Sequence, residues 1–282
     1  MLMNGKALAE RVIDDIKAEA GRMRLRPKLA IILVGNDPPS QVYVRKKIEA
    51  AKKAGIETGL FHLPNDTGER ELFALVEKLN QDKKVDGFIV QVPLPGHIDT
   101  DAVMERIRPE KDVDGLHPLN IGKVVLNLED EAFVPATPAG IILLLEHYKV
   151  RLEGANAVVV GRSSIVGKPV SAMLLNRNAS VSVCHSRTRN LAEFTKKADV
   201  LIVAAGKPGL IKPGMVKQGA WVVDAGTRRL AGRIVGDVDA TVQKKANVSP
   251  VPGGVGPLTV AMLLKNTLKA ARNKMKNKIG NR

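Results

Sequence analysis

Short apolar runs alternate with segments of helical spacing along most of the chain, and this alternation most narrows the possible folds. Residues 29–35 form a continuous apolar run, as expected of a strand buried on both faces, and residues 85–95 read as another buried strand. Helical segments separate them. A second series of the same kind starts with the run at 156–161. Strands that alternate with helices form mainly parallel sheets. The sequence therefore predicts two α/β units, and 282 residues are enough for two cores.

The composition excludes further classes of protein. No apolar run approaches the roughly 18 residues that span a membrane. Cys184 is the only cysteine, which rules out an internal disulfide and fits a reducing cytoplasm. Residues 1–20 read as an amphipathic helix rather than a signal or transit peptide. The five histidines lack the spacing of metal ligands, so no metal site is expected.

The formal net charge of +15 raises the question of a polyanionic partner. A basic nucleic-acid-binding protein is one alternative, and it would bind with a steep dependence on salt. Aromatic residues make up only 3% of the chain, so stacking platforms for single strands are nearly missing. Phosphate-bearing small ligands suit the charge equally well. Nucleic acid is therefore not the expected partner.

Residues 40–54, which begin SQVYVRKK, read as a helix with Ser40 as its N-cap. Tyr43 and Lys47 share one face of this helix, while Lys46 lies on a charged face. An inward lysine has a lowered pKa because burial disfavours its charge, and it can then transfer protons near neutral pH. The alternative is a lysine without a catalytic role, whose aliphatic stem packs along an alanine-rich face while its ammonium reaches solvent. The helix by itself does not decide between them.

Residues 156–175 have the strand–turn–helix pattern of a dinucleotide-binding unit. Gly161 and Gly167 are more widely spaced than in the usual motif, so a turn that binds nothing stays open. The strand at 179–185 is not followed by the acidic residue that selects NAD. Arg162 and the segment 185–188, which contains Ser186 and Arg187, would instead suit a 2′-phosphate. These residue types favour NADP.

Three loops carry residues that the fold alone does not explain. Gln91 ends a buried strand, and its amide must find a partner. Asp114 lies in the segment KDVDG and could accept hydrogen bonds from a heterocycle. Gly253 and Gly254 in the segment at 250–263 would let the backbone approach a ligand closely. Such loops are where α/β proteins bind ligands.

Five segments, in order along residues 4 to 275, resemble the bifunctional methylenetetrahydrofolate dehydrogenase/cyclohydrolase (FolD) family: SQVYVRKK, VQVPLP, PEKDVDGLHPLNIGK, VVVGRSSIVGKP and PVPGGVGPLTVAML. The resemblance implies oxidation of 5,10-methylenetetrahydrofolate by NADP⁺, then hydrolysis of the methenyl product to 10-formyltetrahydrofolate, in one-carbon metabolism. It also implies polyglutamylated tetrahydrofolate substrates and a homodimer. A monofunctional NAD-dependent dehydrogenase is the nearest alternative.

The resemblance also implies roles for individual residues. Lys47 would handle the proton of the hydrolytic step, and Gln91 would tune it. Tyr43 would pack on the aminobenzoyl ring, and Asp114, rather than Asp112, would hold the pterin. Ser40 and the loop residues Pro252, Gly253 and Gly254 would also border the folate. The cofactor positions would be Gly161, Arg162, Ser163, Ser186 and Thr227.

The resemblance implies two α/β domains around a cleft. The folate-binding catalytic domain would comprise residues 1–120 and a C-terminal helix at 258–282. The second domain, residues 121–257, would be Rossmann-like, with a mainly parallel sheet that binds NADP.

Overall fold

The computed structural model describes the backbone of residues 1–230 and 232–280 and the side chains up to residue 276. Two residues of the expected C-terminal helix, 281 and 282, lie outside this described part. The chain divides into two compact units. Unit 1 comprises residues 1–9, 123–128 and 135–259, and unit 2 comprises residues 10–122, 129–134 and 260–282.

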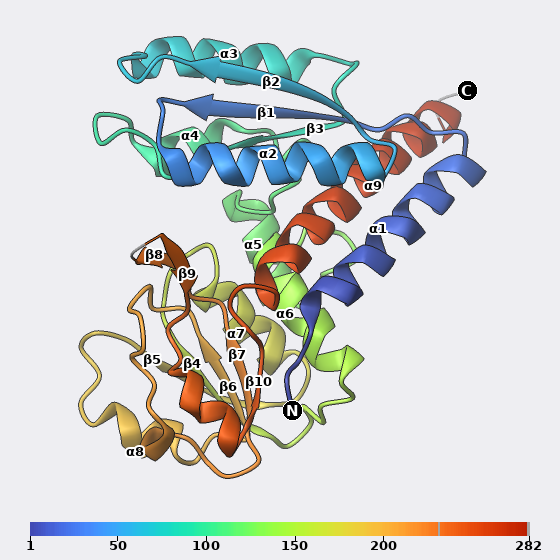
Figure 1. Ribbon diagram of the computed structural model, residues 1–282. Coiled ribbons are helices and arrows are strands. Elements are labelled where there is room, and N and C mark those ends of the chain that lie inside the picture. Colours follow the sequence, from blue (N-terminus) through green and yellow to red (C-terminus); the bar gives the residue numbers. More distant parts are fainter. Residues whose placement is uncertain (231, 281–282) are drawn as a thin grey trace. The chain divides into compact units, whose positions relative to one another are not determined.

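Unit 2 is built on a parallel three-stranded sheet of order β2-β1-β3 (Figure 1). The strands and their helices are β1 (Lys28–Val34), α2 (Pro38–Lys53), β2 (Glu57–Leu63), α3 (Glu69–Gln81), β3 (Gly87–Val90) and α4 (Thr100–Arg106). Ala30, Ile32 and Val34 of β1 pack in one core with buried residues of α3 and α4. Figure 1 shows α2 on the opposite face of the sheet. Because both faces are covered, β1 reads as one apolar run.

Unit 1 is built on a parallel five-stranded sheet of order β10-β7-β6-β4-β5. Its elements are α6 (Ala136–His147), β4 (Asn156–Val160), α7 (Gly167–Leu175), β5 (Ser180–Cys184), α8 (Leu191–Thr195), β6 (Val200–Val203), η1 (Pro213–Met215), β7 (Trp221–Asp224), β8 (Arg228–Leu230), β9 (Arg233–Val235), η2 (Ala240–Lys244) and β10 (Asn247–Val248). The predicted α/β fold with mainly parallel sheets is confirmed. The exception is the antiparallel pair β8–β9.

Three helices contain residues of both units: α1 (Gly5–Arg22), α5 (Pro118–Val125) and α9 (Val255–Gly280). No helix was expected at α5, because residues 109–127 form a loop-rich segment of the sequence. Residues 1–9, which the sequence assigned to the first domain, lie in unit 1, where Met3 N–H donates to Val248 O at 2.9 Å. None of the described helices is both long and apolar enough to cross a membrane.

The start of α2 differs from the prediction. The helix begins at Pro38 rather than after Ser40, and Asp37 is its N-cap. Proline is favoured in the first helical turn because the missing N–H has no partner there in any case. Ser40 therefore lies inside the helix, where its N–H and hydroxyl both donate to Asp37 Oδ2, at 2.9 and 2.6 Å.

Candidate active site

Lys47 is held against the end of β3. Its ammonium Nζ donates to Gln91 Oε1 at 3.0 Å, and Gln91 Nε2 donates to Val92 O at 2.6 Å. Gln91 is only 7% exposed, and its backbone N–H donates to Ile32 O at 2.8 Å. The amide is therefore fixed at both ends, and its oxygen faces the lysine.

Burial lowers the pKa of Lys47. The negative charge of Asp114 acts in the opposite direction, but the effect of burial is larger. The direction agrees with the sequence prediction for an inward-facing lysine. Lys46, one residue earlier, is exposed, also as predicted. A lysine whose pKa is lowered has a larger neutral fraction near pH 7, and the neutral amine can accept a proton. Lys47 therefore has the chemistry of a general base.

Tyr43 lies one helical turn before Lys47 on α2 and is 37% exposed. The residues of α2 that are fully buried are Ser40, Val44 and Ala51, so Tyr43 and Lys47 lie beside the buried face rather than at its centre. The Tyr43 side chain is therefore partly accessible to solvent.

Asp112 and Asp114 have different environments. Asp112 is 1% exposed, and its carboxylate accepts four hydrogen bonds, from the N–H groups of Gly115, Leu116 and His117 and from Asn120 Nδ2. Burial raises the pKa of Asp112 in spite of these bonds. Asp114 is half-buried and close enough to Lys47 to shift its pKa. Asp112 therefore shapes the loop, and Asp114 is the carboxylate available to a ligand.

The two glycines of the dinucleotide motif pack backbone against backbone in unit 1. A Cβ on Gly161 would lie 2.3 Å from Ala204 O, and one on Gly167 would lie 2.3 Å from Gly161 O. Gly161 also has φ of +136°, which side chains disfavour. Only glycine fits either position, and the resulting turn leads directly into the N-terminus of α7, which favours phosphate groups.

The neighbouring residues supply polar and cationic groups. Ser163 Oγ accepts from the N–H groups of Val166 and Gly167 at 3.2 and 3.3 Å, so it helps to start α7. Gly161 N–H donates to Cys184 O at 2.8 Å, which joins the ends of β4 and β5. Arg162 and the turn residues Ser186 and Arg187 are exposed. The first acidic residue after β5 is Glu193, on α8.

The loop at 249–254 is pinned to the start of α1. Gly253 O accepts from the N–H groups of Gly5 and Lys6, each at 3.0 Å. Gly253 has φ of +108°, and Pro252 beside it is exposed. The start of α1 therefore holds the backbone of this loop in place.

The predicted site residues fall into two groups by unit. Unit 2 contains Ser40, Tyr43, Lys47, Gln91 and Asp114, and the structure directly joins Lys47 to Gln91. Unit 1 contains the loop and cofactor residues Gly161, Arg162, Ser163, Ser186, Thr227, Pro252, Gly253 and Gly254. Thr227 is exposed and follows the end of β7.

The sequence did not single out Asp224 or Asp237, which are both buried in unit 1. Asp224 is the last residue of β7. A signal was present, because a charged residue that ends the apolar run WVVD must be satisfied by partners.

The excess positive charge is not shared evenly between the units. Unit 1 contains 19 of the 44 lysines and arginines but only 7 of the 29 aspartates and glutamates, so it accounts for 12 of the 15 net charges. The basic residues are spread along the chain, whereas the acidic residues are concentrated in unit 2. The surplus therefore belongs to the unit with the dinucleotide motif, where it favours phosphate-bearing ligands.

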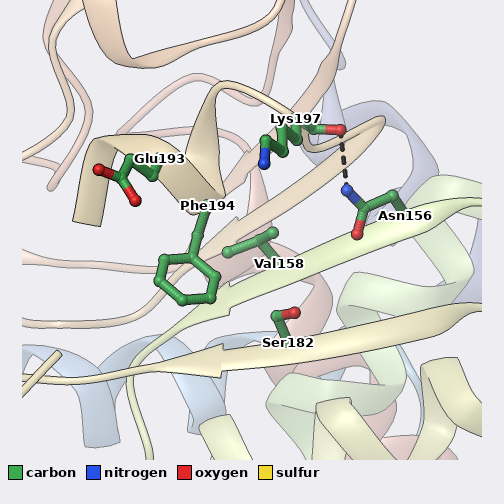
Figure 2. Close-up of a pocket in the computed structure, with 6 residues that line it drawn as sticks. All are labelled: Asn156, Val158, Ser182, Glu193, Phe194 and Lys197. Carbon is green, nitrogen blue, oxygen red and sulfur yellow. Dashed lines mark hydrogen bonds between the residues drawn. The ribbon is translucent and has the colours of Figure 1, made fainter. Parts of the chain in front are cut away.

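A pocket in unit 1 lies away from these residues. Figure 2 shows it between α8 and the strands β4 and β5, lined by Asn156, Val158, Ser182, Glu193, Phe194 and Lys197. Asn156 is the first residue of β4, whereas dinucleotides bind at the carboxyl ends of parallel strands. None of its lining residues belongs to the predicted site. The described part of the chain contains no group of three or more side chains that could hold a metal ion.

Comparison with known proteins finds two family models that match successive parts of the chain. Residues 3–114 match the family model "Tetrahydrofolate dehydrogenase/cyclohydrolase, catalytic domain". Residues 135–275 match the model for the NAD(P)-binding domain of the same family.

Close relatives cover nearly the whole chain. "Bifunctional protein FolD" of Aquifex aeolicus is 50% identical over 280 residues, which are 97% of this chain and 96% of the relative. The crystal structure of bifunctional FolD from Campylobacter jejuni superposes with a TM-score of 0.94 at 47% identity, covering 97% of this chain and 99% of the other. The Trypanosoma brucei FolD, crystallised with NADP cofactor and inhibitor, gives 0.93 at 37% identity, covering 98% of each chain. The chain belongs to the tetrahydrofolate dehydrogenase/cyclohydrolase family.

Proposed function

We propose that this protein oxidises 5,10-methylenetetrahydrofolate with NADP⁺ and hydrolyses the resulting 5,10-methenyltetrahydrofolate to 10-formyltetrahydrofolate, as an enzyme of one-carbon metabolism. The observation that carries the hydrolytic half is the Lys47–Gln91 pair, whose geometry holds a lysine of lowered pKa. The family membership and the glycine turn of unit 1 support the oxidative half.

The cofactor residues fit NADP better than NAD. When bound, NADP⁺ supplies a hydride acceptor. The turn at Gly161 and the start of α7 would bind its phosphates, and Ser163 would be a further cofactor position. Arg162, Ser186 and Arg187 would bind the 2′-phosphate. Since no carboxylate follows β5 before Glu193, the feature that selects NAD is missing, and the NAD-dependent alternative is disfavoured. Thr227 would contact the nicotinamide side.

Hydrolysis of the methenyl group needs a base for the attacking water and a proton for the leaving nitrogen. Neutral Lys47 would accept the proton of water, and the ammonium so formed would return it to the nitrogen. Gln91 suits this cycle because its oxygen orients the amine in either charge state without adding a charge. Asp114 would hold the pterin edge, and Tyr43 would pack on the aminobenzoyl ring. Ser40 and the loop at Pro252–Gly254 would border the folate.

The test compares wild type, Lys47→Met and Lys46→Met in two separate assays. One follows NADPH formation from methylenetetrahydrofolate, and the other follows loss of the methenyl absorbance. We expect Lys47→Met to lose hydrolysis by at least about 100-fold, within the range for loss of a general acid–base group. Lys46→Met is the matched control, because it removes the exposed neighbouring charge on the same helix. Wild-type hydrolysis in Lys47→Met would assign the proton transfer to another residue.

Further features of the family complete the proposal. The folate-binding domain would comprise residues 1–120 and 258–282, and the NADP-binding domain residues 121–257. The substrates would be polyglutamylated. The enzyme would be a homodimer. It would be cytoplasmic, since its single cysteine, Cys184, is buried and unpaired and suits a reducing compartment. Light scattering during size exclusion tests the dimer, and the KM for substrates with one and five glutamates tests the tail preference.

A further inference from the structure

Asp224 and Asp237 of unit 1 are interlocked through two glycines. They are 3% and 1% exposed. A Cβ on Gly226 would lie 2.2 to 2.5 Å from the carboxyl atoms of Asp237, and a Cβ on Gly236 would lie 2.0 Å from Asp224 Oδ2. Each carboxylate thus lies against a glycine that is one or two positions from the other aspartate. Neither glycine can be replaced without moving a carboxylate.

Backbone N–H groups, rather than cations, donate hydrogen bonds to this pair. Asp224 accepts from the N–H groups of Gly226, Asp237 and Val238 at 2.9 to 3.0 Å. Asp237 Oδ2 accepts from the N–H groups of Ala205 and Gly206 at 2.7 and 2.8 Å. Among the described residues, no lysine or arginine forms an ion pair with either carboxylate. The pair therefore bonds to the chain segments that follow β6 and β7, which are neighbouring strands (Figure 1).

Asp237 is connected by direct packing to the dinucleotide turn. The two N–H groups that donate to the Asp237 carboxylate belong to Ala205 and Gly206, which immediately follow Ala204. The carbonyl of Ala204 is the group against which Gly161 packs, and Gly167 packs in turn on Gly161. Asp237 also packs against Gly226, the residue immediately before Thr227. The carboxyl pair thus supports both the phosphate turn and the segment that ends at Thr227.

We propose that Asp224 and Asp237 are positioning residues for NADP, which hold the segments at 204–206 and 224–227 in their binding conformation before the cofactor arrives. The inference rests on the proposed function, because it concerns the same cofactor site. Buried carboxylates suit this role, since each can accept several charge-assisted hydrogen bonds. A site that is ordered in advance loses less entropy on binding.

The test compares Asp237→Ala with Asp237→Asn. Asp237 Oδ1 is buried without a hydrogen-bond partner, so Asn can keep its oxygen on the N–H groups of Ala205 and Gly206 and place its amide nitrogen at the Oδ1 position. Alanine removes both bonds. We expect Asp237→Ala to raise the Kd for NADP, measured by calorimetry, and its KM on the order of tenfold or more, equivalent to about 1.4 kcal/mol. Asp237→Asn should stay within about threefold of wild type.

Hydrolysis of methenyltetrahydrofolate is the internal control. Lys47, Gln91 and Asp114 lie in unit 2, so both variants should hydrolyse at close to the wild-type rate. An unchanged Kd for NADP in Asp237→Ala overturns the inference. An equal loss of both activities also overturns it, because the pair would then support folding in general. If wild type forms no NADPH, the proposed function fails, whereas the inference is still decided by the calorimetric Kd.

A measurement on wild type covers the case in which Asp237→Ala does not fold. Amide hydrogen exchange at Ala205, Gly206 and Gly226 should be slow in the free enzyme and change little when NADP is added, because these N–H groups are held in advance. Fast exchange in the free enzyme that becomes slow with NADP would overturn the inference.

Discussion

Replacing Gln91 with glutamate would put a carboxylate where the amide oxygen now lies, 3.0 Å from the Lys47 ammonium. At an effective dielectric constant of about 20, unit charges at this separation attract by roughly 5 kcal/mol, which corresponds to about 4 pKa units. The attraction opposes the effect of burial, which lowers the pKa of Lys47 in the wild type. The substitution should therefore keep Lys47 protonated at neutral pH.

Below the pKa, the neutral fraction of an amine falls tenfold for each unit by which the pKa rises. Hydrolysis at pH 7 should therefore fall by about 100-fold or more, within the range for loss of a general base. NADPH formation should be affected less, because the cofactor residues lie in unit 1. The loss of the hydrogen bond from Gln91 Nε2 to Val92 O also costs stability, about 1 to 3 kcal/mol, which thermal unfolding would detect.

The assay is the rate of methenyl hydrolysis between pH 6 and 10 for wild type, Gln91→Glu and Gln91→Met. The glutamate variant should recover activity only at high pH. Methionine removes the hydrogen bond without adding a charge, so it should lower the rate without moving the profile to higher pH. If Gln91→Glu has the wild-type rate and pH profile, the neutral form of Lys47 is not the active one, and the reasoning fails.

Other substitutions test the remaining groups of the site. Asp114→Asn removes the charge that raises the pKa of Lys47, so the pH–rate profile for hydrolysis should move to lower pH and the folate KM should rise. Asp112→Ala removes the acceptor of four hydrogen bonds, so the melting temperature should fall by about 10 °C, for about 3 kcal/mol lost. Arg162→Ala should raise the KM for NADP about tenfold or more, because it removes one charge-assisted contact with the 2′-phosphate. The KM for NAD, which lacks this phosphate, should stay unchanged.

The strands were predictable because parallel sheets bury both faces. The runs at β1 and β4 are apolar for this reason, and both were located from the sequence. Helix α5 was missed because its fully buried polar residue, Asn120, is satisfied only by distant groups. Its amide donates to Pro109 O and Asp112 and accepts from Phe133 N–H. Local sequence does not contain such partners.

The candidate site was predictable in part. The spacing of Tyr43 and Lys47 on a helix placed the lysine correctly, but its partner Gln91 is 44 residues away, and only the resemblance to a family linked them. The cofactor turn was recognisable from its strand and helix. The Asp224–Asp237 pair was not recognisable. The carboxylates pack against Gly226 and Gly236, and this tertiary contact leaves no characteristic spacing in the sequence.

Asp224 leads to a prediction about stability and pH. Burial raises the pKa of Asp224 to about 6 from 3.8, so between these values the folded state binds more protons than the unfolded state. The free energy of unfolding of unit 1 must then decrease as pH rises through this window, by about 3 kcal/mol in all and about 2 kcal/mol between pH 4.5 and 7.

Trp221, the only tryptophan, lies three residues before Asp224 on β7, so its fluorescence reports the unfolding of this unit. Asp199 and Asp239, whose pKa values are lowered by Lys217 and by Thr241, contribute with the opposite sign. The useful quantity is therefore the difference between wild type and Asp224→Asn in denaturant unfolding at each pH. Asparagine does not titrate and loses the bond to Val238 N–H at every pH, so this cost is constant. The stability of wild type relative to the variant should fall as pH rises. A difference that is flat or that grows would show that folding does not raise the pKa of Asp224.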